Sequence, residues 1–319
     1  MAVIIIIENI IFKPFPHQRS QGMVSLAHAL IPLALLAFLE PLRTAVTQAI
    51  WYDPAEMRGI KVIVTGASAG IGEQMAYEYA RLGAHVALIS RRESVLRNVA
   101  AKCLELGAAS AVVVAEDVST PEASERALRK VMNAPSFDGK LDILVLNHII
   151  GWWAWWLDDG ADSFDALEKI FRANVFSYIY LSTLAMPALK ESSGRLVVVS
   201  SGAGKMGLPK VAPYSASKHA LHGFFDSLRI EIDYHAIPVS LTMAVLGNID
   251  TASNRKATKG DLKLVKRAPA DDCARAIVSA AGARQRQTFY PASQGLDVIL
   301  KIRPWAHALV DRILRVFAV

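Results

Sequence analysis

The chain has 319 residues, of which 53% are hydrophobic and 20% are charged, and its formal net charge at pH 7 is +6. This length fits one large α/β domain with additional segments or two small domains, and the high apolar content indicates a membrane-facing part. The basic balance is compatible with nucleic acid, an anionic membrane surface or a phosphorylated cofactor, but the absence of a long lysine and arginine run argues against nucleic acid.

The N-terminal part, residues 1–52, contains two apolar runs at residues 2–12 and 24–39. Neither is a clean run of about twenty apolar residues, although the second could cross a membrane marginally or bend into it. We predict that residues 1–52 associate with the membrane; a helix packed on the domain is the alternative. Asp53-Pro54 marks the hinge into the globular part.

From residue 59 onward, short apolar segments alternate with amphipathic helical segments. Near-continuous apolar runs between helices are typical of a parallel sheet covered on both faces, and right-handed crossovers make such a sheet doubly wound. The predicted fold class is therefore α/β, with a single Rossmann-like domain over residues 53–290. We predict a helix over residues 70–82 and strands at Lys61–Thr65, His85–Ser90, 111–115, 141–146, 195–200 and 239–246.

The C-terminal segment, residues 291–319, mixes aliphatic and aromatic residues with lysine and arginine. A basic amphipathic helix of this kind suits a membrane surface or a partner subunit. A helix that closes the core of the domain is the alternative.

The first strand runs directly into a glycine-rich turn, TGASAGIG (65–72), that opens a helix. Glycines let the backbone approach a pyrophosphate, whose charge is met by the helix N-terminus. The position after a strand, at the start of the alternating region, favours a dinucleotide site over an empty tight turn. The candidate cofactor contacts in this turn are Gly66, Ser68, Ala69, Gly70, Ile71 and Gly72.

The end of the second strand indicates the form of the cofactor. An acidic residue there would bind the ribose 2′-hydroxyl of NAD, whereas an arginine accommodates the 2′-phosphate of NADP. The sequence has Arg91 and Arg92 at this point, and a guanidinium pairs with phosphate through two parallel hydrogen bonds. We therefore predict NADP(H); two solvated surface arginines are the alternative.

Polar residues also follow the third and fourth strands. A carboxylate at Asp117 can accept from an adenine amino group, and the carboxyl edge of such a sheet is where ligands bind. The predicted cofactor contacts at these two strand ends are Asp117, Val118, Asn147, His148 and Ile149.

Tyr214 and Lys218 open the helix after the fifth strand and, being four residues apart, lie on one helical face. A nearby ammonium stabilises phenolate and so lowers a tyrosine pKa from its reference value of about 10. This suits a general acid for a ketone or a base for an alcohol. Ser201, at the end of the fifth strand, can hold the substrate oxygen beside Tyr214; a strand-end turn residue is the alternative.

The two cysteines, Cys103 and Cys273, lack CxxC spacing. We therefore expect no metal site and no disulfide framework, and we predict two separate buried thiols, with one disulfide as the alternative.

Together these motifs resemble the short-chain dehydrogenase/reductase family, and the resemblance extends over residues 59–282. Within that family the chain is most similar to the 11-beta-hydroxysteroid dehydrogenase type 1 and type 1-like group. The segments that carry the resemblance are TGASAGIG (65–72), CLELGAAS (103–110), LVLNHI (144–149), Asn174, VVVSS (197–201), YSASKHALHGFF (214–225) and VLGNIDT (245–251).

The resemblance implies a role for each matching position. Tyr214 would donate or accept the proton, Lys218 would tune it and hold the nicotinamide ribose, and Ser201 would orient the carbonyl. Asn174 would hold a water of the proton relay. The cofactor would supply the redox chemistry and the protein the orientation and the proton.

Further positions match or depart from the family pattern. Ile249 and Thr251 would contact the nicotinamide carboxamide. Ala69 and Leu208 stand where some steroid reductases of the group have a lysine and a tyrosine. The segment WWAWW (152–156) has no counterpart and could wall an apolar substrate pocket, enter a membrane interface or pack in the core.

The resemblance therefore implies an NADP(H)-dependent oxidoreductase that interconverts a ketone and a secondary alcohol on a steroid-like or other lipophilic substrate. A retinol or other lipid dehydrogenase, and a non-catalytic membrane-anchored NADP-binding scaffold, are the alternatives. The family points to a homodimer at the endoplasmic reticulum membrane, with lipid droplets as the alternative. Lys13 and Arg19 precede the second apolar run, which favours a luminal catalytic domain by the positive-inside tendency.

Overall fold

A computed structural model describes residues 53–159, 163–258, 266–294 and 300 of the chain. The predictions for residues 1–52, and for nearly all of the C-terminal segment from residue 295 onward, lie outside these residues. At the start of the described part, the side chain of Asp53 accepts a hydrogen bond from the backbone N–H of Ala55 and caps a short helix, η1 (Pro54–Met57). Within the described residues, no helix is both long and apolar enough to cross a membrane.

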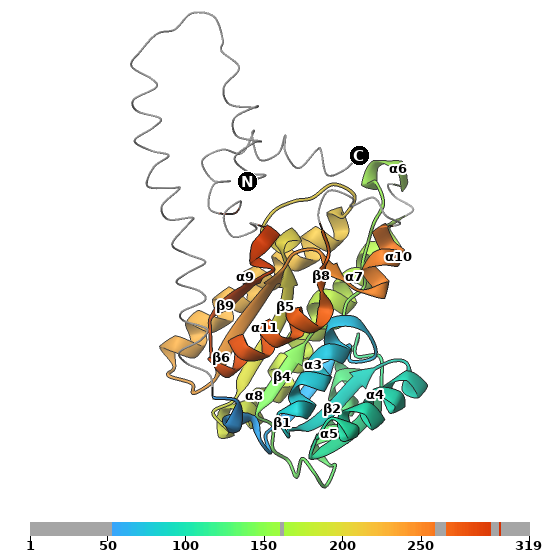
Figure 1. Ribbon diagram of the computed structural model, residues 1–319. Coiled ribbons are helices and arrows are strands. Elements are labelled where there is room, and N and C mark those ends of the chain that lie inside the picture. Colours follow the sequence, from blue (N-terminus) through green and yellow to red (C-terminus); the bar gives the residue numbers. More distant parts are fainter. Residues whose placement is uncertain (1–52, 160–162, 259–265, 295–299, 301–319) are drawn as a thin grey trace, which may run out of the picture. The chain divides into compact units, whose positions relative to one another are not determined.

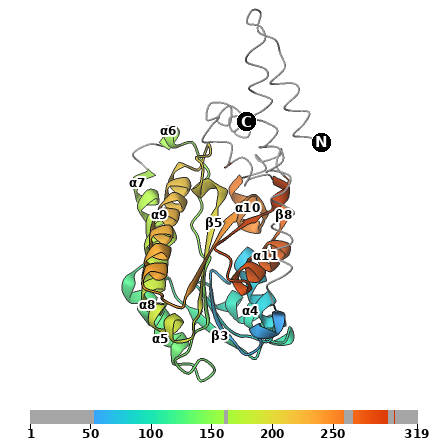
Figure 2. The same cartoon turned by 90° about the vertical axis from the view of Figure 1, so that its left-hand side faces the viewer.

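A seven-stranded sheet with the order β3-β2-β1-β4-β5-β6-β9 forms the middle layer of the molecule (Figures 1 and 2). Every neighbouring pair in it is parallel. The strand order reverses between β1 and β4, and this switch point is where open α/β sheets bind ligands. The strands are β1 (Lys61–Thr65), β2 (His85–Ser90), β3 (Ser110–Ala115), β4 (Ile143–Leu146), β5 (Arg195–Ser201), β6 (Ser240–Leu246) and β9 (Gln287–Tyr290).

Helices cover both faces of the sheet, and each face has its own buried apolar cluster. Successive residues of a strand point to opposite faces, so Ile63 belongs to one cluster while Val62 and Val64 belong to the other. One face carries α3 (Gly70–Arg81), α4 (Glu93–Glu105) and α11 (Ala270–Gly282), and the other α5 (Pro121–Met132), α8 (Ser177–Glu191) and α9 (Ala212–Tyr234).

The remaining elements lie in the connections between these layers. The main irregular helix is a π-helical segment, η3, which joins two helices after β4; such segments are frequent at functional sites. The connecting elements are α6 (Trp156–Asp159), α7 (Phe164–Phe171), η3 (Arg172–Phe176), η4 (Gly202–Gly204), β7 (Ile249–Asp250), α10 (Ala252–Thr258), β8 (Ala268–Pro269) and η5 (Ala292–Gln294).

The structure confirms the predicted α/β fold with a doubly wound parallel sheet, and the predicted strands agree with the observed ones within two residues at each end. The edge strand β9 and the small β7–β8 pair were not predicted. Cys103 and Cys273 are free and buried, as predicted.

Candidate active site

The predicted site residues converge on the carboxyl ends of β1, β2, β4 and β5, with Tyr214 and Lys218 contributed by the first turns of α9. The strand order reverses between β1 and β4, and both strands end at this edge of the sheet.

Two glycines of the turn between β1 and α3, Gly66 and Gly72, have no room for a side chain. Gly66 has a φ of +66°, and a Cβ there would lie 2.7 Å from the Cα of His148. A Cβ on Gly72 would lie 2.3 Å from the carbonyl oxygen of Gly66. Ala69 precedes α3 and provides no side-chain cap, so the first N–H groups of the helix are available to an anion. The turn therefore fits the pyrophosphate of a dinucleotide.

The two arginines after β2 have different partners. The guanidinium of Arg92 donates to the hydroxyl of Ser68 at 3.0 Å and to its carbonyl at 3.3 Å, so Arg92 lies over the glycine turn. The guanidinium of Arg91 is 3.9 Å from the carboxylate of Asp117, and both side chains are more than half exposed. Asp117 also accepts from the N–H of Ser119. Both guanidinium groups are exposed and therefore available to an anion from solvent.

Asn147 and Ile149, which follow β4, have different surroundings. The backbone N–H of Asn147 donates to the Thr65 hydroxyl at 2.9 Å, and its side-chain amide donates to the Thr65 carbonyl at 3.2 Å. That amide lies against Gly66 and Gly72. Ile149 is about half exposed, at 47%, and is available to a ligand.

His148 is held by the protein at both ring nitrogens. Nδ1 is 2.8 Å from the Thr65 hydroxyl, and Nε2 is 2.6 Å from the Ser177 hydroxyl. Burial lowers the pKa of His148 to about 3, so the ring is neutral. The imidazole therefore joins β4 to β1 and α8, and only its backbone remains for the predicted cofactor contact.

Asn174 is fully buried in η3 and satisfies both backbone polar groups of Ile150. Its Oδ1 accepts from the Ile150 N–H at 2.7 Å, and its Nδ2 donates to the Ile150 carbonyl at 2.9 Å and to the Ser217 hydroxyl at 3.2 Å. The amide thus ties the loop after β4 to α9, a contact that the sequence did not indicate.

Ser201, Tyr214 and Lys218 lie together, as predicted. The Tyr214 hydroxyl is hydrogen-bonded to Ser201, and the Lys218 ammonium donates to the Val199 carbonyl at 2.8 Å. The ammonium lies 5.9 Å from the centre of the Tyr214 ring and 5.3 Å from that of Tyr178. All three polar groups face the end of β5.

The electrostatics of this pair differ from the expectation. Burial raises the pKa of Tyr214, and the hydrogen bond with Ser201 only opposes this. Burial also lowers the pKa of Lys218 to about 7. The predicted lowering of the tyrosine pKa by Lys218 is therefore not found: burial is the main cause of the shift, the hydrogen bond with Ser201 opposes it, and the Lys218 ammonium is bound to a carbonyl.

The segment after β6 reaches the same site. Ile249 is buried, and a Cβ on Gly70 would lie 3.1 Å from the Cγ2 of Thr251. Thr251 therefore borders the glycine turn, while its hydroxyl accepts from the N–H of Asn254 at the start of α10.

The tryptophan segment is not part of the core. Trp155 is 47% exposed, Leu157 is 94% exposed and none of the four tryptophans is buried, so the core-packing alternative is wrong. The N–H of Ala154 donates to the Lys210 carbonyl, and the Lys210 ammonium lies 5.9 and 5.4 Å from the ring centres of Trp153 and Trp155. The segment is thus attached to the loop that precedes Tyr214.

Two residues of the site were missed by the sequence analysis. The Thr65 hydroxyl binds the residues after β4, and the Tyr178 hydroxyl donates to the His148 carbonyl at 2.9 Å while its ring lies beside Lys218. Tyr178 follows Asn174 by four residues, and this helical spacing is the one signal that could have indicated it.

Comparisons with known proteins identify the family of the chain. A family model described as short chain dehydrogenase matches residues 61–262. The chain is 42% identical over 240 residues to the hydroxysteroid 11-beta-dehydrogenase 1-like protein of Xenopus tropicalis, covering 75% of this chain and 82% of that protein. It is 43% identical over 242 residues to the protein of the same name from Gallus gallus, covering 75% and 81%.

Solved structures share the fold. A short-chain dehydrogenase/reductase from Burkholderia phymatum in complex with NAD matches with a TM-score of 0.69 at 20% identity, covering 80% of this chain and 96% of that one. An alcohol dehydrogenase from Thermococcus sibiricus complexed with 5-hydroxy-NADP matches with a TM-score of 0.62 at 21% identity, covering 72% and 95%.

Proposed function

The chain belongs to the short-chain dehydrogenase/reductase family, and from this premise we propose that it interconverts a ketone and a secondary alcohol with NADP(H). The substrate is steroid-like or otherwise lipophilic. The observation that carries the proposal is the meeting of Ser201, Tyr214 and Lys218 at the end of β5, at the same sheet edge as a glycine turn that fits a dinucleotide.

The proton chemistry follows from the two hydroxyl groups. When bound, the nicotinamide ring supplies or accepts the hydride. A carbonyl oxygen that enters between the hydroxyls of Ser201 and Tyr214 replaces their mutual hydrogen bond and accepts one from each, which orients and polarises the carbonyl. Because burial raises the pKa of Tyr214, its phenol keeps its proton at neutral pH and can donate it to the developing alkoxide. Alcohol oxidation uses the reverse transfer.

Lys218 and Asn174 support this transfer. Lys218, with a pKa near 7, can gain or lose a proton at neutral pH beside the ring of Tyr214. Asn174 fixes the loop after β4 against the helix that carries both residues. The assigned roles thus divide into substrate contact, proton exchange and alignment.

Arg91 and Arg92 support the choice of NADP(H) over NAD(H). Arg92 is bound to the Ser68 hydroxyl and carbonyl, which aims a guanidinium at the edge of the glycine turn. A 2′-phosphate in this position would compete for these exposed donors with strong, bidentate acceptor oxygens.

Exposed apolar side chains at the carboxyl end of the sheet support a lipophilic substrate. Ile149, Trp155 and Leu157 are exposed at this end of the sheet, and the relatives described above are named for hydroxysteroids. A retinol or other lipid alcohol would suit the same apolar wall. A non-catalytic NADP-binding scaffold remains the alternative from another class.

We further propose that the protein associates with the endoplasmic reticulum membrane, with residues 1–52 and the exposed tryptophan segment as contacts. Tryptophan concentrates at membrane interfaces, and Lys210 adds a cation there. Protease protection in sealed microsomes tests the luminal placement of the catalytic domain.

We also propose a homodimer. Leu184 of α8 and Ile230 and Tyr234 of α9 are exposed large apolar side chains on helices that cover the same face of the sheet. Light scattering on the purified chain tests this proposal: a monomer mass would overturn it.

The function itself is tested by a panel of lipophilic ketones and alcohols, assayed with NADPH, NADH, NADP⁺ and NAD⁺ side by side. We expect turnover of at least one ketone or alcohol, with higher kcat/KM for the phosphorylated cofactor. Tight NADPH binding without turnover on a broad panel of steroids, retinoids and other lipids would favour the scaffold.

A further inference from the structure

A buried histidine, His222, lies on the same face of α9 as the proton-transfer pair, Tyr214 and Lys218. Tyr214, Lys218, His222 and Asp226 follow one another at intervals of four residues, so they lie on one face of the helix. His222 is only 6% exposed, and the mechanism above assigns it no role.

His222 is bonded to the residue that precedes Ser201. Its Nε2 lies 3.0 Å from the hydroxyl of Ser200, which is 2% exposed. One turn earlier, Lys218 donates to the carbonyl of Val199. Two side chains of α9 that are one helical turn apart therefore bind two consecutive residues of β5, immediately before Ser201.

The far side of the imidazole has no such bond. Nδ1 of His222 is buried and has no hydrogen-bond partner among the described residues. A ring that served only as a polar bridge within a network would engage both nitrogens, as His148 does. The single bond to Ser200 is thus the interaction that accounts for a histidine at this position.

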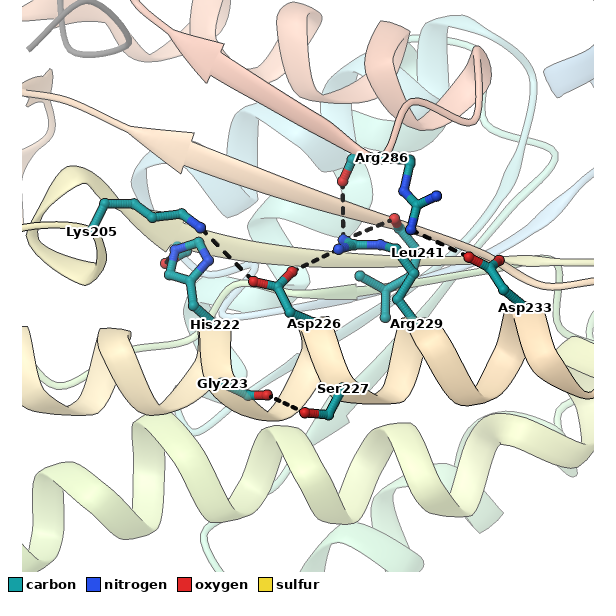
Figure 3. Close-up of polar contacts among 10 residues, drawn as sticks. Lys205, His222, Gly223, Asp226, Ser227, Arg229, Asp233, Leu241 and Arg286 are labelled. Carbon is teal, nitrogen blue, oxygen red and sulfur yellow. Dashed lines mark hydrogen bonds and ion pairs between the residues drawn. The ribbon is translucent and has the colours of Figure 1, made fainter. Parts of the chain in front are cut away.

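Charged groups surround the ring but do not bond to it (Figure 3). Lys205, at the end of η4, lies 3.9 Å from the carboxylate of Asp226, which also pairs with Arg229 at 2.6 Å. Lys218 and His219 lie on the same helix as His222. Burial, and next the ammonium of Lys205, lower the pKa of His222 to about 4 against the opposing carboxylate of Asp226. The imidazole is therefore neutral at physiological pH.

A neutral group at this position affects Lys218. The charged or titratable groups around Lys218 are Tyr214 and His222 on α9, Tyr178 on α8 and His148 after β4. None of these supplies a negative charge at neutral pH, and burial holds the pKa of Lys218 at about 7. A carboxylate in place of His222 would favour the ammonium form and raise that pKa.

We propose that His222 is a positioning residue for the proton-transfer pair: through Ser200 it fixes the end of β5, and with it Ser201, against α9, and it does so without placing a charge beside Lys218. The inference rests on the proposed function, which gives Tyr214 and Lys218 their role in proton transfer. The hydrogen bond between His222 and Ser200 and the neutral state of the imidazole do not depend on that function.

Three substitutions separate the two parts of the role. His222→Gln keeps a neutral group that can bond to the Ser200 hydroxyl. His222→Phe keeps a ring but leaves that buried hydroxyl without its partner. His222→Asp introduces a carboxylate beside Lys218. The exposed His235 at the end of α9 provides the matched control, His235→Gln.

The full-length chain is measured in two ways. Lysine-selective ¹³C labelling and NMR follow the titration of Lys218, whose signal is identified by its loss in Lys218→Arg. Steady-state kinetics with NADPH and the best ketone of the panel give kcat and KM across pH. Thermal melting and NADPH binding report whether each variant is folded.

We expect the Lys218 midpoint to rise measurably in His222→Asp, because a carboxylate one helical turn from Lys218 favours the ammonium form, and to stay unchanged in His222→Gln and His235→Gln. We expect kcat to fall by roughly tenfold in His222→Phe with KM for NADPH within about twofold, because misplacement of Ser201 affects the reaction and not cofactor binding. His222→Gln should restore kcat.

An unchanged Lys218 midpoint in a folded His222→Asp, or a wild-type kcat in His222→Phe, would overturn the inference. If His222→Phe does not fold, failure of His222→Gln to retain wild-type kcat has the same consequence. The NMR titration needs no substrate, so an inactive wild-type chain would count against the proposed function while the Lys218 midpoint still decides this inference.

Discussion

Arg92 and Arg91 show how neighbouring identical residues acquire different roles. Arg92 is bonded to Ser68 at the glycine turn, whereas Arg91 is 3.9 Å from Asp117. A guanidinium already aimed at the turn loses less side-chain entropy when a phosphate arrives than one that is free in solvent. The structure therefore makes Arg92 at least as strong a candidate for the 2′-phosphate as Arg91.

Replacing either arginine by alanine is expected to raise KM for NADPH by roughly tenfold, the equivalent of about 1.4 kcal/mol and within the range of a charge-assisted hydrogen bond. KM for NADH should remain within about twofold, because NADH has no 2′-phosphate. Arg97, which is exposed and pairs with Glu93 on α4, provides the control Arg97→Ala. Equal losses with NADPH and NADH would mean that the arginines serve the fold and not the phosphate.

Glycines in two helices, α3 and α9, have very different surroundings. A Cβ on Gly72 would meet the Gly66 carbonyl at 2.3 Å and the Asn147 amide at 2.5 Å, whereas a Cβ on Gly223, in the exposed face of α9, would meet nothing within 4 Å. The same residue type is thus required in one helix and only tolerated in the other.

Gly72→Ala is expected to destabilise the protein by about 1–3 kcal/mol, as overpacking typically does, and to weaken NADPH binding because the turn must shift. Gly223→Ala is expected to stabilise it by about 0.8–1 kcal/mol, the difference in helix propensity. Denaturant unfolding and a cofactor-binding titration measure both effects. A Gly72→Ala protein with wild-type stability and NADPH affinity would show that the turn has room that the structure does not give it.

The sequence predicts those elements whose signal is local. The strand Lys61–Thr65 is a continuous apolar run followed by glycines, and its bounds were predicted without error. The edge strand Gln287–Tyr290 mixes polar and aromatic residues and is identified by its pairing with β6.

For the site, too, the sequence predicts only those features that have a local signal. Tyr214, Lys218 and Ser201 follow a spacing that the sequence shows, so their meeting could be predicted. The Ser200–His222 contact joins residues 22 positions apart. Burial, which raises the pKa of Tyr214, depends on packing that no local pattern records. Desolvation is a property of the assembled core.

At the scale of the whole molecule, the exposed apolar residues are not spread evenly. Ile149, Trp155 and Leu157 belong to the connection between β4 and α7, and Phe164 begins α7. Helix α6 within that connection projects beyond the end of the sheet (Figure 1). The segment that we propose as a membrane contact and the exposed apolar residues that we propose to favour a lipophilic substrate therefore lie in the same stretch of the chain.

We expect brominated lipids in anionic vesicles to quench part of the tryptophan fluorescence of the wild-type protein, and Trp155→Phe to reduce the quenched fraction. Leu104→Ser, which changes an exposed apolar residue of α4, should leave the quenched fraction unchanged. The same quenched fraction in wild type and Trp155→Phe would place Trp155 away from the lipid.

The central claim is that Tyr214 exchanges the substrate proton, and the most direct test is single-turnover ketone reduction by NADPH in wild type and Tyr214→Phe. We predict that the substitution lowers the rate by at least about a hundredfold, the lower end of general acid catalysis, while NADPH binds with unchanged affinity. A Tyr214→Phe protein that reduces the ketone at the wild-type rate would contradict the account.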